Sequence, residues 1–262
     1  MNPAPPLVLC LSGLDPTGGA GIQADIEAIA ATGAHALPVV TALTVQDTRN
    51  VVSSTAVNPD LIARQIDALI ADCRIAAVKI GLLGDATQVD LIVERLTTLD
   101  VPVVCDPVLR AGGGTDLVTA GLLAALRERL LPRVTVLTPN AAEARRLASG
   151  AEDVSGCAQS LLARGCRHVL ITGGDEPGAS VVNIWFTSGQ IPRRFEWTRL
   201  PETFHGAGCT LAAAIAARLA HGAAIGAAIE DAQRWTQKAL EHALRVGKGR
   251  RVPRRLNVED GA

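Results

Sequence analysis

Short apolar runs rich in β-branched residues alternate along the chain with longer, alanine-rich runs that carry polar residues at helical spacing. This alternation is typical of βαβ units that build a mostly parallel sheet. The predicted strands are residues 7–12, 36–42, 76–81, 101–106, 134–138 and 168–172. The predicted helices are residues 20–32, 59–73, 86–98, 119–130, 140–148, 155–164, 207–220 and 223–245. The pattern therefore predicts an α/β protein.

The regular alternation of predicted strands and helices ends after Gly178. The stretch "SVVNIWFTSGQIPRRFEWTRL" has two β-rich runs around a Ser-Gly pair, which predicts a hairpin at one edge of the sheet. The sequence contains no evident linker, repeat or low-complexity segment. Its 262 residues, of which 48% are hydrophobic, are enough for a large core, so we predict one domain over residues 1–262.

Composition and charge narrow the class of function. Aromatic residues make up 2% of the chain, tyrosine is absent and the formal net charge is −1, so no nucleic-acid partner is expected. Six cysteines occur without a C-x-x-C pair, which argues against structural zinc or disulfides and favours a reduced, cytoplasmic protein. The N-terminal apolar run is too short for a signal peptide or a membrane span, so no membrane partner is expected.

A basic run, "GKGRRVPRR", begins at Gly247 and leads into a basic tail at about residues 248–262. Such a run is either a patch for nucleic acid or membrane, or a solvated extension. Because charge is balanced over the rest of the chain, we favour the solvated extension.

A polar or glycine-rich segment follows each of the six predicted strands. These segments are "SGLDPTGGAG", "TALTVQDT", "KIGLLGD", "DPVLRAGGG", "TPNAAEA" and "TGGDEPG". Turn chemistry explains each one alone, but ligands of parallel sheets bind at the carboxyl ends of the strands, so together they predict one site. The first segment lacks the G-x-G-x-x-G and Walker A spacings, which disfavours a dinucleotide-dependent oxidoreductase.

The segment "HGAGCT" opens a predicted helix. A helix start exposes backbone N–H groups, and Gly206 and Gly208 allow an anion to approach them closely. Cys209 is either a small packing residue or a thiol with a lowered pKa, and the spacing alone favours packing. His205 is more typical of a surface or capping residue than of a catalytic base.

Carboxylates and an amide follow two other strands. Asp106 lies at a strand end before a glycine run, where it suits a hydrated Mg²⁺. Asn140 and Glu143 are three residues apart and share one helix face, which gives a second candidate set. The same pair also fits an N-cap asparagine with a capping-box glutamate, and the residues alone favour the cap.

Taken in order, "SGLDPTGGAGIQAD", "TALTVQDTRNV", "VKIGLLGD", "CDPVLRAGGG", "LTPNAAEA" and "HGAGCTLAAAIAA" closely resemble the hydroxymethylpyrimidine/phosphomethylpyrimidine kinases of thiamine biosynthesis, in the ribokinase-like superfamily. The resemblance covers about residues 7–247. It implies a three-layer αβα fold with a mostly parallel central sheet and, usually, a homodimer. It also implies transfer of phosphate from ATP, with Mg²⁺, to the hydroxymethyl group of the pyrimidine, and then a second transfer that gives the diphosphate.

The resemblance assigns roles to individual residues. The implied pyrimidine pocket consists of Gly13, Asp15, Ala20, Thr44, Gln46, Leu82 and Val108. The implied nucleotide positions are Asp106, Asn140, Glu143, Thr172 and Gly174, with Asp106 and Glu143 as magnesium ligands. The implied catalytic element is Gly206, Ala207, Gly208 and Cys209. In it, Cys209 takes the proton of the substrate's alcohol while backbone N–H groups stabilise the transferring oxygens.

Three positions depart from the common pattern of this family. Many relatives have glutamate at the position of Gln46, threonine at that of Ala207 and lysine at that of Thr172. The missing lysine predicts weaker triphosphate binding unless another basic residue or a monovalent ion compensates. The missing lysine gives one alternative, a non-catalytic, pyrimidine-binding sensor domain. A pyridoxine or pyridoxal kinase is the other alternative, because vitamin B6 has a similar ring with a hydroxymethyl group.

Overall fold

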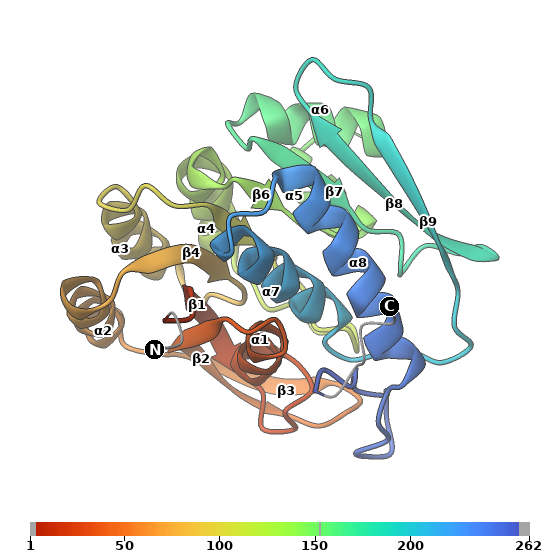
Figure 1. Cartoon of the computed structure of the whole chain (residues 1–262), viewed down its shortest axis with the longest axis horizontal. Helices are drawn as coiled ribbons and strands as arrows, with labels where there is room; N and C mark the ends of the chain where they lie inside the picture. The colour runs from red at the N-terminus through yellow and green to blue at the C-terminus, as the bar shows by residue number, and fades with distance from the viewer. Residues whose placement is uncertain (1–3, 152, 257–262) are drawn as a thin grey trace.

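The computed structural model describes residues 4–151 and 153–256, and across them one nine-stranded sheet has the order β3-β2-β1-β4-β5-β6-β7-β8-β9 (Figure 1). The strands are β1 (Leu7–Leu14), β2 (His35–Gln46), β3 (Val51–Ala56), β4 (Ile75–Ile80), β5 (Val103–Cys105), β6 (Val136–Leu137), β7 (His168–Ile171), β8 (Ser180–Thr187) and β9 (Arg193–Thr198). The six strands from β2 to β7 in this order pair in parallel. Strands β3, β8 and β9 pair antiparallel at the two edges.

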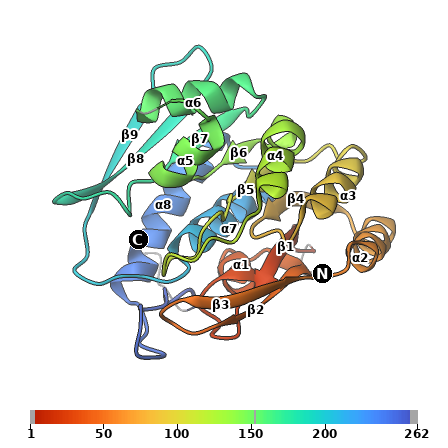
Figure 2. The ribbon, with the colours of Figure 1, turned by 180° about the vertical axis from the view of Figure 1, so that it is seen from behind.

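Helices cover both faces of the sheet. The helices are α1 (Gly21–Ala30), α2 (Pro59–Asp72), α3 (Ala86–Leu96), α4 (Ala120–Ala125), α5 (Ala141–Ala148), α6 (Val154–Ala163), α7 (Ala207–Ala220) and α8 (Ile225–Glu241). Helices α1, α7 and α8 cover one face, and α2 to α6 cover the other (Figures 1 and 2). The predicted three-layer αβα fold is confirmed.

The central strands are apolar throughout because both of their faces are buried. In β1, Val8 and Cys10 pack with the layer of α1, α7 and α8, while Leu9 and Leu11 pack with the opposite layer. All four side chains are at most 1% exposed. This placement explains why the strands read as continuous apolar runs in the sequence.

The predicted elements are present, with differences at their ends. The predicted edge hairpin is β8 and β9. The predicted helix over 119–130 is α4 followed by a π-helical turn at Leu126–Leu130 and a 3₁₀ turn at Leu131–Arg133. Strand β3 was not predicted, because five of its six residues are exposed and its run of serine and threonine lacks an apolar pattern.

The expectation of a solvated extension was wrong for residues 247–255. Arg251 bridges to Phe204, and Val252 pairs with Leu244, so the chain turns back onto the end of α8. Val252 and Arg255 are 5% and 1% exposed. Basic composition concealed this packing because the charge of Arg255 is satisfied internally, by Glu27 and by backbone carbonyls. Residues 257–262 of the predicted tail lie outside the described residues.

In the part of the chain that the structure describes, no helix combines the length and the apolar character that crossing a membrane requires.

Candidate active site

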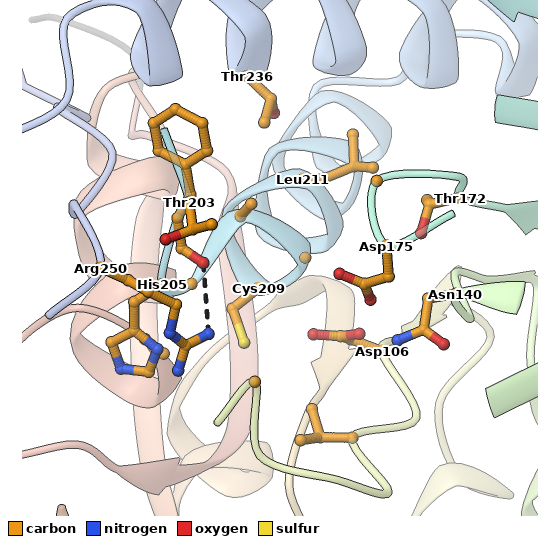
Figure 3. A pocket seen from close by; sticks show the side chains of 18 of the residues that line it. Asp106, Asn140, Thr172, Asp175, Thr203, His205, Cys209, Leu211, Thr236 and Arg250 are labelled. Atoms are coloured by element: carbon orange, nitrogen blue, oxygen red, sulfur yellow. Dashed lines mark hydrogen bonds between the residues drawn. The ribbon is translucent and has the colours of Figure 1, made fainter. Parts of the chain in front are cut away.

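A pocket of about 490 Å³ opens at the carboxyl ends of the parallel strands. It lies between the loops that follow these strands and the N-terminal end of α7 (Figure 3). Every site residue named from the sequence lines it: Gly13, Asp15, Ala20, Thr44, Gln46, Leu82, Asp106, Val108, Asn140, Glu143, Thr172, Gly174, Gly206, Ala207, Gly208 and Cys209. The fold therefore gathers all of these positions in one place.

Helix α7 begins in a way that leaves its first N–H groups open to the pocket. Its N-cap, Gly206, has φ 85° and ψ 13°, and no side chain of the described residues caps the helix. A Cβ at this position would collide with the carbonyl oxygen of Gly19, so both conformation and space require glycine. With residues 206–209 lining the pocket, this start has the form of an anion hole.

The half-buried side chain of Cys209 lies beside Asp106 at this helix start (Figure 3). Burial raises the pKa of the Cys209 thiol, and the negative charge of Asp106 raises it further. The positive charge of Lys79 lowers it, and the result remains well above the usual range of a thiol. In the protein without substrates, burial and negative charge thus outweigh the positive charge of Lys79, and Cys209 is protonated at neutral pH.

A fully buried ion pair adjoins this thiol and was missed by the sequence analysis. Nζ of Lys79 lies 2.8 Å from Oδ1 of Asp25 and donates a 2.9 Å hydrogen bond to Oγ of Ser12. Burial lowers the pKa of Lys79, but the charge of Asp25 and the hydrogen bond to it act against burial, and the pKa stays above its usual range, so Lys79 is protonated. The signal in the sequence was a single lysine inside the apolar strand "AAVKIG".

Of the two interpretations of Asn140 and Glu143, the capping box is confirmed, and the magnesium and nucleotide role stays a prediction. A capping box is present: Oδ1 of Asn140 accepts from the Glu143 N–H at 2.9 Å, and Oε2 of Glu143 accepts from the Asn140 N–H at 3.0 Å. Oε1 of Glu143 also accepts from the Leu109 N–H at 3.2 Å. Burial and the neighbouring charge of Asp106 nevertheless raise the pKa of Glu143 to about 8.

Asp106 and Glu143 have the character of a site for a divalent cation. Burial raises the pKa of Asp106 as well, so two adjacent carboxyls with 5% and 7% exposure resist being charged together. A cation between them and a bound phosphate removes that penalty, and Mg²⁺ prefers one or two carboxylates with phosphate oxygens. No group of three or more His, Cys, Asp or Glu side chains suited to a metal occurs among the described residues.

His205 is buried, which corrects the expectation of a surface or capping residue. Its Nε2 lies 2.7 Å from Oδ2 of Asp15, and its side chain is 9% exposed. Burial raises the pKa of Asp15, but hydrogen bonds from His205 and Thr17 hold it below its usual range. Asp15 also accepts from the N–H groups of Thr17 and Ala20, at 2.8 Å each. This carboxylate therefore shapes the glycine turn before α1.

The proposed pyrimidine side of the pocket is formed by β1, β2 and the loop after β4. A Cβ at Gly13 would lie 2.9 Å from Cδ2 of Leu82, so glycine lets these two segments meet. Nε2 of Gln46 donates to Oγ1 of Thr44 at 2.8 Å. The carbonyl oxygen of the Gln46 amide thus remains available to a ligand.

The opposite side lies after β7, around Thr172 and Gly174. The backbone N–H of Thr172 donates to the Pro139 carbonyl at 2.9 Å. Several further pocket residues were not singled out from the sequence. Arg110 and Asp175 lie within two of the predicted site segments, whereas Trp197, Arg199, Gln233 and Arg250 come from other parts of the chain. These four carry no local signal, because only the fold brings them to the pocket.

Known kinases are similar to this chain in sequence and in fold. The chain aligns over 253 residues at 38% identity with the hydroxymethylpyrimidine/phosphomethylpyrimidine kinase of Escherichia coli, covering 92% of this chain and 94% of that protein. A phosphomethylpyrimidine kinase structure from Clostridium difficile has a TM-score of 0.77 at 30% identity, over 89% of this chain and 98% of the other. An ADP complex of Bacillus subtilis pyridoxal kinase has a TM-score of 0.85 at 28% identity, and the match covers 96% of this chain and 98% of the other.

Fold and site together define a small-molecule kinase with the ribokinase-like fold. The model of the family "Phosphomethylpyrimidine kinase" matches residues 15–254, and the chain belongs to this family.

Proposed function

We propose that this protein is a hydroxymethylpyrimidine/phosphomethylpyrimidine kinase of thiamine biosynthesis. It transfers the γ-phosphoryl group of ATP to 4-amino-5-hydroxymethyl-2-methylpyrimidine (HMP) and then a second one to HMP phosphate. The observation that carries the proposal is the uncapped start of α7, whose open N–H groups and Cys209 lie beside Asp106 in the pocket. The match of the chain to the phosphomethylpyrimidine kinase family supports the choice of substrate.

In the first transfer, the hydroxymethyl oxygen forms a bond to the γ-phosphorus as the bond to the β,γ-bridging oxygen breaks, and ADP leaves with that electron pair. The N–H groups of residues 207–209 stabilise negative charge on the transferring oxygens. Cys209 accepts the proton of the alcohol as a thiolate. Because burial and the charge of Asp106 raise the pKa of this thiol, the role requires Cys209 to have lost its own proton once both substrates are bound, which needs positive charge that offsets both effects.

Asp106 and Glu143 are the residues that would hold Mg²⁺, and both Glu143 oxygens already accept backbone N–H groups. The ion, when bound, supplies positive charge to the phosphates of ATP. Asn140, Thr172 and Gly174 are proposed to line the nucleotide side. Gly13, Asp15, Ala20, Thr44, Gln46, Leu82 and Val108 are proposed to line the pyrimidine side.

We further propose one kinase domain that forms a cytoplasmic homodimer. Leu43 and Val45 on β2 and Val52 on β3 are 49%, 61% and 78% exposed. Leu43 and Val45 alternate with Thr44 and Gln46, so they lie on the side of the strand opposite the pocket. An apolar strip at a sheet edge suits contact with a second copy of the chain. Free thiols at the six cysteines fit a reducing compartment.

A pyridoxal kinase is the second candidate, because the similarity to Bacillus subtilis pyridoxal kinase extends over 96% of the chain. The test compares kcat/KM for HMP and for pyridoxal, with ADP release and product mass as readouts. A higher value for HMP supports the proposal, and a higher value for pyridoxal overturns it. Pyrimidine binding without ADP release would instead indicate the non-catalytic sensor.

A further inference from the structure

Arg250 enters the pocket from the C-terminal segment that turns back onto α8. Its backbone N–H donates to the Thr48 carbonyl at 3.0 Å, and the next N–H, of Arg251, donates to the Thr203 carbonyl at 3.0 Å. The His205 N–H in turn donates to the Arg251 carbonyl at 2.8 Å. The backbone that carries Arg250 is therefore fixed on both sides, immediately beside the start of α7.

The guanidinium of Arg250 is poorly satisfied by the protein itself. Its Nη1 lies 3.4 Å from the Phe204 carbonyl and its Nη2 lies 3.5 Å from the Arg49 carbonyl, both long for hydrogen bonds. Its Nε is buried without any hydrogen-bond partner among the described residues. Burial lowers the pKa of this group, although the charges of Asp175 and Asp15 act against that.

The other two arginines that line the pocket, Arg110 and Arg199, are held by loop carbonyls, although Nε of Arg199 also lacks a partner among the described residues. The terminal nitrogens of Arg199 donate to four carbonyls that hold the loop after β7 and the start of β8, those of Gly173, Gly174, Glu176 and Ser180. Nε of Arg110 donates to the Gly114 carbonyl at 2.5 Å within its own loop. Arg250 thus combines partial burial with terminal nitrogens that make only long contacts to the protein, whereas Arg110 is exposed and the terminal nitrogens of Arg199 are engaged by the loop after β7.

The position of Arg250 indicates which part of a ligand it meets. A Cβ at Gly112 would collide with its guanidinium, so Arg250 packs on the loop that continues from Val108 on the pyrimidine side. Its Nη1 reaches Phe204, two residues before the N-cap of α7. Figure 3 shows the guanidinium directed to the same part of the pocket as His205 and Cys209. Arg250 therefore lies between the pyrimidine side and the anion hole.

We propose that Arg250 binds the phosphate of the phosphomonoester acceptor and thereby selects for the second phosphoryl transfer. This inference rests on the proposed function, since it assigns a residue to one of its two steps. The acceptor of the first step is a neutral alcohol, whereas the acceptor of the second carries a phosphate with up to two negative charges. That phosphate must approach the γ-phosphate of ATP beside Asp15 and Asp106, so the second step needs a further cation, in addition to the one proposed for the ATP phosphates, that the first step does not need.

The two steps also differ in their need for a base. In the second transfer, an unesterified oxygen of the acceptor phosphate forms a bond to the γ-phosphorus, and the bond to the β,γ-bridging oxygen breaks. ADP leaves with the electron pair, and the product is the diphosphate ester. An oxygen of the dianion carries no proton, so Cys209 has no proton to accept in this step. Arg250 and Cys209 therefore favour opposite steps.

The experiment measures kcat/KM with HMP and with HMP phosphate for wild type, Arg250→Gln, Arg250→Lys and Cys209→Ala, with products separated and weighed by mass spectrometry. Because a hydrogen bond to a charged group is lost, Arg250→Gln should lower the ratio of kcat/KM for HMP phosphate to kcat/KM for HMP roughly 10- to 100-fold. Arg250→Lys should lower this ratio less, and Cys209→Ala should raise it. Arg254→Gln is the matched control, because Arg254 is exposed on the same segment and both transfers should remain as in wild type.

Binding without ATP gives a readout that is independent of turnover. Titration calorimetry should show that Arg250→Gln weakens the binding of HMP phosphate much more than the binding of HMP. Melting temperatures confirm that each variant is folded. Equal loss of both transfers, or loss of neither, overturns the role of Arg250. A wild-type protein that does not phosphorylate HMP at all refutes the proposed function itself.

Discussion

Replacing Arg255 by leucine tests whether the C-terminal segment is part of the folded core. The Arg255 side chain is 0% exposed, and its Nη1 lies 3.1 Å from Oε2 of Glu27. Its Nε donates to Oγ1 of Thr210 at 2.8 Å, and its Nη groups donate to the carbonyls of Gly18 and Gly19. One side chain thus joins the turn before α1, helix α1 itself and the first turn of α7.

The expected cost follows from these bonds. Arg255→Leu keeps apolar volume but leaves Glu27, a hydroxyl and two carbonyls without their donor. Breaking a buried ion pair from one side costs about 3–5 kcal/mol, which for a chain of this size corresponds to a fall in melting temperature of roughly 6–20 °C. The free energy of unfolding is measured by urea denaturation followed by circular dichroism at pH 7.

The matched control is Arg254→Leu, because Arg254 is exposed and adjacent. It should change the free energy of unfolding by less than about 0.5 kcal/mol. If Arg255→Leu is no more destabilising than Arg254→Leu, the segment is a solvated extension after all. The placement of Arg250 in the pocket would then lose its structural basis.

Three further predictions concern single positions in the site. Gly206→Ala should lower the free energy of unfolding by at least about 1 kcal/mol and abolish turnover, since φ is 85° there and a Cβ meets the Gly19 carbonyl; a stable, active variant in denaturation and kinase assays would contradict this. Glu143, whose pKa is raised by burial from 4.5 to about 8, binds more protons folded than unfolded, so wild-type stability should fall as pH rises between these values. Glu143→Gln, which keeps the capping box, should remove that fall in urea titrations at pH 5 to 8 in EDTA, and an unchanged slope would show that Glu143 is charged when buried. Gln46→Ala should raise KM for HMP about 10-fold with little change in kcat, because it removes a hydrogen-bonding amide from the pyrimidine side, and an unaltered KM would exclude Gln46 from the pocket wall.

The parts of the fold that were predictable from sequence are those whose local pattern is set by burial. Strand β1 reads as a strand because Val8 to Leu11 are buried on both faces, and α7 reads as a helix because alanine and leucine fill its length. Strand β3 was not predictable, because an exposed antiparallel edge strand needs no apolar pattern. Its pairing with β2 is a property of the sheet as a whole.

The residues of the site likewise divide into those that were predictable from sequence and those that were not. Gly206 and Asp106 were found because glycines and carboxylates at strand ends leave a local signature. Arg250 was not found, since a basic run has the same composition whether it is solvated or packed. Its position depends on Val252 pairing with Leu244 and on the buried Arg255. Those contacts join residues far apart in the chain, and only the folded structure brings them together.

Whether the protein is a pyrimidine kinase is tested by incubating the purified wild-type protein with ATP, Mg²⁺ and HMP and following ADP release together with product mass. We expect HMP phosphate first and HMP diphosphate afterwards, with a kcat/KM for HMP above that for pyridoxal. Absence of ADP release with HMP, or a clear preference for pyridoxal, would contradict this expectation.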